Sequence, residues 1–394
     1  MLVASQFIES IKYSKDDPAE YGINLDLIQK NYADQHNTDH GRIALLSNYV
    51  KISKELFPSI NESIDNGLNK LNITRNDKIS FYLTASSESN AFCRVSPSTS
   101  HVDIVVNSRL IELLSSKELS SVIGHEIAHY LYKHYLYPDP GQSSNETGYI
   151  NKLSLSKAAE ISADRVGLIA SGNLKYSLQS LFKNITGLPD KYIQFDYDNF
   201  LKQLNDLKEF NNNFSQLYST HPSILNRIQA LIWFSQTYEY QKNILGSNEG
   251  KFNLAEVDTK INKSITDVIG EEHSKQNKEV VESLKLWVTI SLFLIDNNFS
   301  KEEKNIFTQH FGEEKLNDIK YFLKSASAKS IDDKIQESLH NSLELTKSNK
   351  ENLLYELELI AGMVDSEERK IIEKLSKISS GLGLNTSVTI RKDN

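Results

Sequence analysis

The sequence predicts an α+β protein that is mainly α-helical. Helical periodicity recurs along the chain, and after His221 the pattern is helical almost to the end. Only 77–84 and 102–107, which are rich in Ile, Val, Phe and Tyr, are strong strand candidates. We therefore expect a small β-sheet surrounded by many helices.

The length of 394 residues is sufficient for two or three domains. We expect a lead-in segment with short helices over 1–40, a domain that contains the sheet over 41–245, and an all-α helical bundle over 251–394. The boundary is placed at the short polar break 246–250.

Composition excludes several classes of protein. The formal net charge of −8, with Lys and Glu well mixed, argues against a nucleic-acid partner. The single cysteine, Cys93, excludes an intramolecular disulfide and a multi-cysteine metal site. No signal peptide is visible, and the most apolar run, 286–295, is shorter than the ~20 residues of a membrane span. We therefore expect no membrane span and a soluble, cytoplasmic protein.

The elements before the middle of the chain follow from periodicity and capping. Residues 43–57 have a helical pattern, which Pro58 is expected to bend or break. A serine-rich connection, 86–100, joins the two strand candidates. Ser115 and Glu118 then form a capping box, so a helix is expected to begin just before Leu119.

This helix carries the pattern H-E-x-x-H as His125, Glu126 and His129. Two imidazoles at i and i+4 lie on one helix face, where they can hold a zinc ion beside the Glu126 carboxylate, a candidate general base. The alternative is a pair of exposed histidines on a surface helix. Gly124 either lets another element approach closely or is an ordinary tolerated helix glycine.

A third ligand is expected from a second helix. Ser156 is a candidate N-cap for a helix that continues to about Ala170, and Glu160 and Asp164 are again i and i+4 on it. One carboxylate could bind the metal while the other orients a ligating histidine. A solvated acidic face is the alternative. The loop 137–154, which joins the two helices, could cover the cleft.

Together, the motifs G-H-E-I-A-H at 124–129 and E-x-x-A-D-R-x-G at 160–167 resemble the gluzincin metallopeptidases of the CAAX prenyl endopeptidase and HtpX type. The resemblance covers roughly residues 40–240. It implies a gluzincin-type domain with a small β-sheet, and zinc bound by His125, His129 and Glu160.

The resemblance also includes an upstream asparagine-alanine-phenylalanine element, which Asn90, Ala91 and Phe92 match. In the family this element lies on an edge strand. An extended peptide can add to such a strand through main-chain hydrogen bonds. These three residues are therefore expected to bind substrate.

A late threonine-histidine-proline, followed by an arginine, completes the resemblance. It implies that His221 stabilises the oxyanion that develops during peptide hydrolysis. Arg227 is expected to hold the His221 helix in place or to contact substrate, and a plain surface arginine is equally compatible. A structural interpretation, in which Thr220 caps a helix that begins at Pro222, is also open.

The C-terminal region contains an internal repeat at an offset of 65 residues, in which 292–307 matches 357–372. In each copy an apolar helix ends in a turn, and Ser300 or Asp365 then caps the next helix, with Glu303 or Glu368 at the capping-box position. The pattern resembles a TerB-type tellurite-resistance helical domain, and a generic helical bundle is the alternative. Docking of a protein partner or self-association is the expected use of this region.

These observations predict a soluble zinc-dependent endopeptidase that binds one zinc ion per chain and acts on peptide or protein substrates, with a C-terminal helical domain for regulation or docking. A different gluzincin, such as an aminopeptidase, is a second possibility, although no amine-recognition motif supports it. The third is a zinc-stabilised interaction or chaperone-like protein without catalysis. Retention of Glu126 favours an enzyme.

Overall fold

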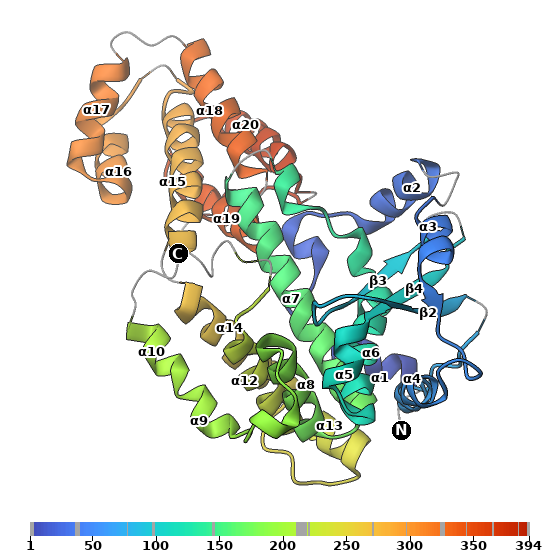
Figure 1. Ribbon diagram of the computed structural model, residues 1–394. Helices are drawn as coiled ribbons and strands as arrows, with labels where there is room; N and C mark the ends of the chain where they lie inside the picture. The colour runs from blue at the N-terminus through green and yellow to red at the C-terminus, as the bar shows by residue number, and fades with distance from the viewer. Residues whose placement is uncertain are drawn as a thin grey trace. The chain divides into compact units, whose positions relative to one another are not determined.

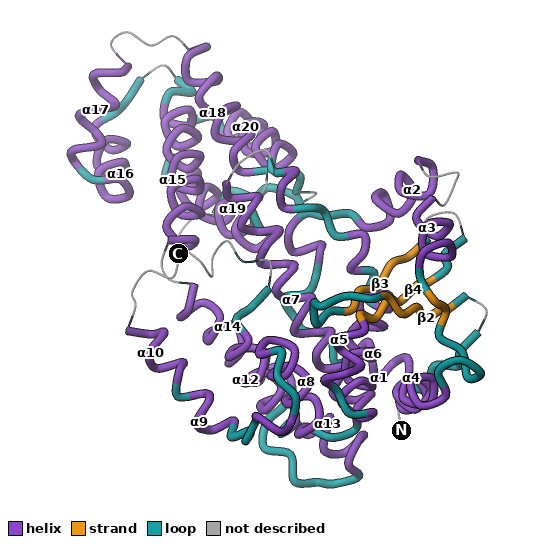
Figure 2. Tube along the Cα trace, viewed as in Figure 1, coloured by secondary structure: helices purple, strands orange, loops and turns teal. Residues whose placement is uncertain are grey.

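A computed structural model of the 394-residue chain describes residues 4–35, 40–76, 78–96, 99–143, 146–209, 219, 221–269, 272–296, 298–323, 328–343, 345–364, 366–384 and 386–391. Helices account for most of the described residues, and the strands gather in one small sheet (Figure 2). The predicted α+β, mainly α, fold class is therefore confirmed. Among the described residues, no helix is both long and apolar enough to cross a bilayer.

The chain divides into two compact units. The first unit comprises Met1–Pro18, Asn24–Asp139 and Lys152–Gly270, and the second comprises Ala19–Ile23, Pro140–Asn151 and Glu271–Asn394. The limits of the predicted domains, 41–245 and 251–394, stay a prediction.

The first unit contains the sheet and the helices around it (Figure 1). Its elements are α1 (Ala4–Ser10), α2 (Leu25–Gln35), α3 (His40–Asn48), β1 (Val50–Lys51), α4 (Pro58–Lys70), β2 (Ile79–Thr84), β3 (Ala91–Val95), β4 (Val102–Asn107), α5 (Ser108–Leu113), α6 (Ser116–Leu131), the 3-10 turn η2 (His134–Leu136), most of α7 (Glu146–Ser171), α8 (Leu174–Thr186), η4 (Asp190–Tyr192), α9 (Tyr197–Leu201), α10 (Gln203–Glu209), α12 (Ile224–Ser235), α13 (Tyr238–Tyr240), the π-turn η5 (Gln241–Leu245) and α14 (Leu254–Ile269).

The sheet has the strand order β1-β2-β4-β3. Strand β2 runs parallel to β4, with Ile79 opposite Val102, and these are the two strands expected from the sequence. Strands β1 and β3 pair antiparallel at the two edges. All six β4 side chains are buried, in keeping with the central position of this strand.

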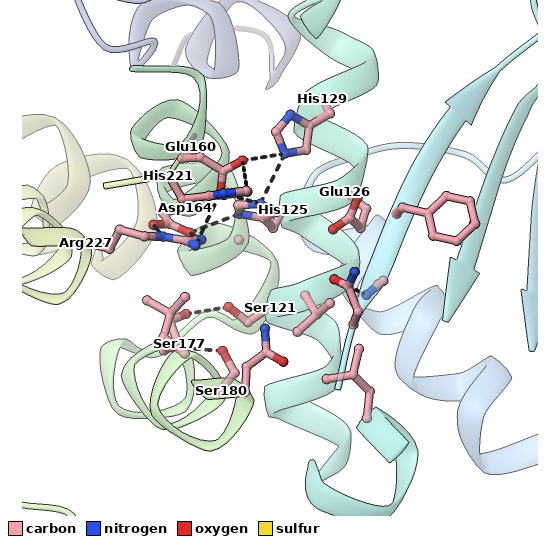
Figure 3. A pocket seen from close by; sticks show the side chains of 18 of the residues that line it. Ser121, His125, Glu126, His129, Glu160, Asp164, Ser177, Ser180, His221 and Arg227 are labelled. Carbon is pink, nitrogen blue, oxygen red and sulfur yellow. Dashed lines mark hydrogen bonds and ion pairs between the residues drawn. The ribbon is translucent and has the colours of Figure 1, made fainter. Parts of the chain in front are cut away.

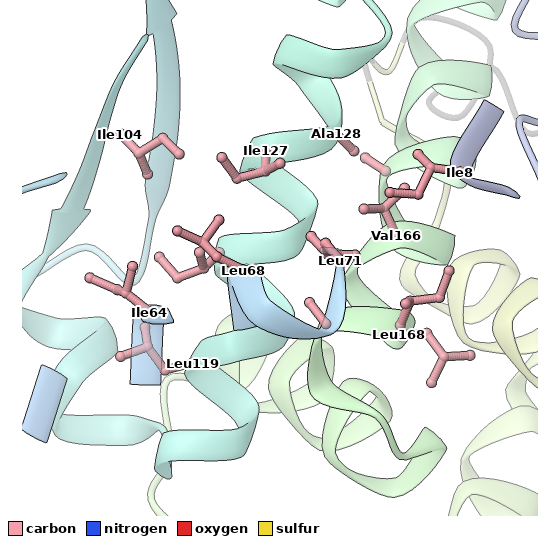
Figure 4. Packing of buried hydrophobic residues seen from close by; sticks show 14 of the residues in the cluster. Ile8, Ile64, Leu68, Leu71, Ile104, Leu119, Ile127, Ala128, Val166 and Leu168 are labelled. Carbon is pink, nitrogen blue, oxygen red and sulfur yellow. The ribbon is translucent and has the colours of Figure 1, made fainter. Parts of the chain in front are cut away.

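The core of the first unit surrounds α6. Leu119 and Ile127 of α6 pack with Ile64 of α4, Ile104 of β4 and Val166 of α7 in one buried cluster (Figure 4). The capping box of Ser115 and Glu118 starts α6 as predicted, and the Ser115 N–H donates to Glu118 Oε2 over 2.7 Å. A helix packed on several sides offers a firm support for a functional site.

Three local predictions are wrong. Pro58 is not a break within a helix: α3 ends at Asn48, and Pro58 is the first residue of α4, where its missing N–H costs nothing. The loop predicted over 137–154 is shorter, because α7 begins at Glu146. Ser156 therefore lies inside α7, and its hydroxyl donates to the Lys152 carbonyl rather than capping the helix.

The helix after His221 begins at Ile224, and the Ser223 hydroxyl accepts a hydrogen bond from the Asn226 N–H at its N-cap. Thr220, the cap considered from the sequence, lies outside the described residues.

The second unit is helical throughout its described part. It contains η1 (Pro18–Tyr21), whose first residue belongs to the first unit, η3 (Pro140–Gln142), the start of α7, and α15 (Glu272–Phe293), α16 (Lys301–Phe311), α17 (Glu313–Leu323), α18 (Ala328–Ser342), α19 (Lys347–Gly362) and α20 (Glu368–Gly381). The two repeat copies correspond to α15–α16 and α19–α20. The capping box of Ser300 and Glu303 begins α16, as expected. The capping box expected in the second copy is wrong: Glu367 is the N-cap of α20 and Glu368 its first residue, while Asp365 lies outside the described residues.

Candidate metal centre

Helices α6 and α7 cross closely because glycines face one another. A Cβ atom on Gly124 would lie 2.4 Å from the Ala170 Cβ and 3.1 Å from the Gly167 Cα, and a Cβ on Gly167 would lie 2.7 Å from the Ser121 carbonyl oxygen. Of the two interpretations of Gly124, the close approach of another element is therefore the correct one. The crossing brings the histidines of α6 to the carboxylates of α7.

His125, His129 and Glu160 converge at this crossing (Figure 3). The Nε2 atoms of the two histidines are 3.2 Å apart, and the Glu160 carboxylate oxygens lie 3.4 Å from His125 Nε2 and 3.5 Å from His129 Nε2. One possible ligand atom from each residue lies within 4.8 Å of the others. Two imidazole nitrogens and a carboxylate oxygen form a donor set suited to a transition metal.

Asp164 and Arg227 support this cluster. Asp164 Oδ1 lies 3.0 Å from His125 Nδ1, so it accepts a hydrogen bond from the ring nitrogen opposite the cluster. The Arg227 guanidinium donates to both oxygens of Asp164, at 2.8 and 2.6 Å, and also lies 3.3 Å from Glu160. The surface interpretation of Arg227 is wrong, because its side chain is 14% exposed and joins two carboxylates of the site.

Burial and paired charges shift the pKa values of the cluster. Burial acts against charge on both carboxylates, but Arg227 and His125 together outweigh it and hold the pKa of Glu160 and of Asp164 below the usual range. Burial lowers the pKa of His129 to about 3. At His125 the same effect is outweighed by Glu160 and Asp164, which raise its pKa to about 10. A metal ion would have to displace the proton of His125, as ligation of an imidazole requires.

Glu126 projects from α6 towards β3 and lines the same cavity as the ligand cluster (Figure 3). Burial raises its pKa to about 7, while the His125 charge and a hydrogen bond from the Cys93 backbone N–H oppose the shift. A carboxylate with a pKa near neutrality is suited to accept a proton from a reacting group and to return it.

Strand β3 presents backbone groups to this site. The Asn107 N–H donates to the Asn90 carbonyl over 3.0 Å, which fixes the phase of the antiparallel β3–β4 pair. Since hydrogen-bonded and non-bonded positions alternate in such a pair, Ala91 and Cys93 turn their N–H and C=O groups to the free edge. Two of these groups are engaged: the Asn90 side chain accepts from the Ala91 N–H over 2.9 Å, and Glu126 accepts from Cys93.

A cavity of about 470 Å³ contains all the residues predicted for the site: Asn90, Ala91, Phe92, His125, Glu126, His129, Glu160, Asp164, His221 and Arg227. His221 is the most exposed of the ion-paired residues that line this cavity, with a side chain that is 60% exposed and an Nε2 atom 3.8 Å from Glu160 Oε1. Residues as far apart in the sequence as Asn90 and Arg227 thus share one cleft.

Two parts of this region are not predicted from the sequence. Ser121, Ser177 and Ser180 line the cavity on the α8 side, and the Ser121 hydroxyl donates to Ser177 over 2.9 Å (Figure 3). Serines are common in helices, so nothing in the sequence marked them. His134 lies beside His129, with their Nδ1 atoms 2.8 Å apart. A third histidine shortly after H-E-x-x-H was a visible signal that was not used.

Comparison with known proteins agrees with this geometry. Residues 55–144 and 143–232 match the model of the family described as Peptidase family M48, so this part of the chain is similar to the M48 metallopeptidases. The chain is also similar to the plastoglobule-localized metallopeptidase 48, chloroplastic, of Arabidopsis thaliana, with 28% identity over 169 residues. The matched region covers 37% of this chain and 48% of that relative, about half its length. No solved structure matches the chain.

Proposed function

We propose that this chain is a zinc-dependent endopeptidase in which Glu126 is the general base. The proposal rests above all on one observation, the convergence of His125, His129 and Glu160 beside a buried Glu126 in a single cleft. The M48 match supports a metallopeptidase in general. The metal, the bond cleaved and the role of each residue are our proposal.

The spacing of the three ligand residues supports zinc. In a tetrahedral site with Zn–N and Zn–O distances of ~2.0–2.1 Å, neighbouring ligand atoms are roughly 3.3 Å apart. The two histidine Nε2 atoms are 3.2 Å apart, close to this value, and Glu160 presents one oxygen 3.4 Å from His125 Nε2 and the other 3.5 Å from His129 Nε2. Three protein ligands leave the fourth position of such a site open, as catalytic zinc requires. Calcium and magnesium prefer sites made of oxygen ligands alone.

Glu126 takes and returns a proton during hydrolysis. When bound, the zinc ion supplies Lewis-acid catalysis at the peptide carbonyl. Glu126 accepts the proton of the attacking water and donates it to the leaving amine, and its pKa of about 7 suits both transfers. Arg227 keeps Glu160 and Asp164 ionised, so that Glu160 can bind the metal and Asp164 can fix the proton of His125 on Nδ1.

His221 supplies a hydrogen bond to the oxyanion. Its exposed imidazole lies at the edge of the cleft, close to Glu160, where it can approach a bound peptide. Removal of one such donor commonly costs about 10²–10³ in rate. His221→Ala should therefore lower kcat by roughly this factor while the metal content is unchanged.

The edge of β3 binds the substrate backbone. Ala91 and Cys93 turn main-chain groups to this edge, and an extended peptide can hydrogen-bond there as an added strand. Asn90 and Phe92 flank the same position, and both line the cavity. The serine-lined part of the cleft is then available to a substrate side chain.

For the second unit we propose a regulatory or docking role, through a protein partner or a second copy of the chain. Its helix-turn-helix repeat supports a TerB-like bundle. Within the M48 family we propose that the catalytic region is of the CAAX prenyl endopeptidase and HtpX type, on the motifs at 124–129 and 160–167.

The decisive experiment compares wild type with Glu126→Gln. Wild type should bind about one zinc ion per chain and cleave unstructured peptides internally, whereas Glu126→Gln should keep the metal and lose at least ~10²–10⁴ of the rate. Metal content is measured by atomic emission and cleavage sites by mass spectrometry. Undiminished cleavage in Glu126→Gln would contradict the mechanism. Zinc binding without cleavage in wild type would favour the non-catalytic alternative.

A further inference from the structure

The end of α6 turns back on the metal centre. Lys133 adopts the left-handed conformation, with φ of 58°, which a residue other than glycine adopts at some cost. The turn places His134 against His129, with ring centroids 5.0 Å apart in an edge-on arrangement. Strained backbone of this kind persists where surrounding contacts stabilise it.

Hydrogen bonds continue from His129 through His134 to a carboxylate. The Nδ1 atoms of the two histidines are 2.8 Å apart, and His134 Nε2 lies 2.9 Å from Asp16 Oδ2. The other oxygen of Asp16 accepts a hydrogen bond from the Tyr137 hydroxyl over 2.6 Å. The Asp16 side chain is fully buried, so its charge depends on these donors and on Lys12, 4.0 Å away.

The chain of contacts allows only one arrangement of protons when His129 binds a metal. Its Nε2 atom faces His125 and Glu160 and must be unprotonated, so the His129 proton lies on Nδ1. His134 Nδ1 must then accept this proton's hydrogen bond, and the His134 proton lies on Nε2. Asp16, a carboxylate that only accepts, stabilises that last donor.

We propose that Asp16 and His134 are positioning residues of the metal centre, which fix the tautomer and ring orientation of His129. The inference rests on the proposed zinc site and extends it to the N-terminal segment. His125 is oriented directly by Asp164, and His129 is oriented by Asp16 through His134. Each ligating imidazole thus has a buried carboxylate behind it.

The N-terminal segment is held firmly enough to act in this way. The Tyr132 hydroxyl donates to the Ile8 carbonyl, and the buried Tyr13 N–H donates to the Ser162 hydroxyl over 3.0 Å. The first contact holds the segment to Tyr132, which directly follows α6, and the second holds it to α7. These two helices carry the proposed metal ligands. Residues 8–16 precede the region that matches the family model, which begins at residue 55. The segment expected to be a mere lead-in therefore takes part in the site.

The test measures zinc affinity of the full-length protein, by competition with a chromophoric chelator. Asp16→Asn and His134→Leu should each weaken zinc binding about 10–100-fold, the usual effect of losing a partner of a metal ligand. His134→Gln should recover most of the affinity, because its side-chain oxygen can accept from His129 while its amide donates to Asp16. A purely space-filling role of His134 would not be rescued in this way.

Two further variants separate positioning from general destabilisation. Glu118→Gln removes a buried carboxylate of the same unit that contacts Lys183 and no metal ligand, so it should lower thermal stability while zinc affinity stays within about twofold. Tyr137→Phe removes one donor to Asp16 and should weaken zinc binding roughly twofold to fivefold, even if Asp16→Asn fails to fold.

Ring ¹⁵N shifts of the zinc-loaded protein give a readout that does not depend on activity. Wild type should show the proton on Nδ1 of His129 and on Nε2 of His134, and Asp16→Asn should disturb the His134 pattern. Unchanged zinc affinity in folded Asp16→Asn and His134→Leu would overturn the inference. An equal loss in Glu118→Gln would do the same. If wild type binds zinc without cleaving peptides, the proposed function fails while the inference is still tested.

Discussion

The two units bury charge in different ways. In the first unit, the described buried charges include Glu126, Glu160 and Asp164 around one cleft, and many of them contact one another. In the second unit, the buried charges of the described residues are Glu303, Lys350 and Glu358, each of which stabilises a helix start, a turn or the chain end.

Buried charges that contact one another around a cavity indicate a functional site, whereas buried charges that each hold a separate segment indicate a structural role. Burial of an ionised group is costly unless it is paired and hydrogen-bonded. In the second unit the three charges lie apart: Glu303 and Lys350 bond to nearby backbone, and Glu358 holds the segment at 389–391. In the first unit the charges compensate one another in a group that faces a cavity. Matched substitutions in the two units can test this distinction.

The largest effect is expected for Glu160→Ala compared with Glu358→Ala. Both carboxylates are buried and both pair with an arginine, but only Glu160 faces the histidines. Glu160→Ala should lower zinc affinity by more than the ~100-fold expected for a residue behind a ligand. Glu358→Ala should destabilise the protein and leave the metal content unchanged. Equal metal content in the two variants would mean that Glu160 is not a ligand.

The next comparison uses the two capping boxes. Glu118 of α6 and Glu303 of α16 occupy the same capping position, but Glu118 also receives a hydrogen bond from buried Lys183 over 2.8 Å. Glu118→Ala should cost about 2–3 kcal/mol, because Lys183 keeps only Asp190 as a partner, whereas Glu303→Ala should cost about 1 kcal/mol. Chemical denaturation measures both values. Similar losses would show that the buried pair adds little.

A smaller change is expected at Asp164. Asp164→Asn keeps an acceptor for His125 but removes the charge that faces Arg227. Zinc affinity should fall about 10–100-fold, less than the fall expected for Glu160→Ala. Isothermal titration with zinc distinguishes the two. A loss as great as that of Glu160→Ala would indicate that Asp164 binds the metal itself.

The smallest effects are expected at two glycines. In Gly124→Ala the new methyl group meets Ala170 and the α7 backbone, neither of which can move easily, so a loss of about 1–3 kcal/mol is expected. In Gly381→Ala of α20 the methyl group meets only the Leu339 side chain, 3.1 Å away, and the loss should be below about 1 kcal/mol. Thermal melts of both variants test the order. The reverse order would show that the α6–α7 crossing tolerates separation.

Features that depend on residues close together in the sequence could be predicted from it. The ligands His125 and His129 and the capping box of Ser115 depend on residues within one or two helical turns, and the structure places them as the sequence indicates. The start of α7 was not predicted, because Ser156 resembles an N-cap residue. The helix already includes the residues before Ser156, so its hydroxyl donates to the Lys152 carbonyl instead of capping.

Contacts between distant segments were beyond the reach of local patterns. Strand β3 shows little alternation of apolar and polar residues, and its pairing with β4 depends on the whole sheet. Nothing near Asp16 indicates a residue 118 positions away, and its contact with His134 exists only after the N-terminal segment has packed on α6 and α7. The periodicity of α6 was enough to predict a ligand-bearing helix, but not what lies behind His129.

The free edge of β3 also affects whether the protein aggregates at high concentration. An exposed strand edge can pair with the same edge of another copy and begin an open-ended aggregate. On β3 the outward N–H groups of Ala91 and Cys93 are already satisfied by Asn90 and Glu126. An approaching edge therefore meets free carbonyl acceptors at Ala91 and Cys93, whereas the N–H groups of these two residues are already engaged. A second copy would have to displace Asn90 and Glu126 to pair fully with this edge, which disfavours open-ended association of the protein.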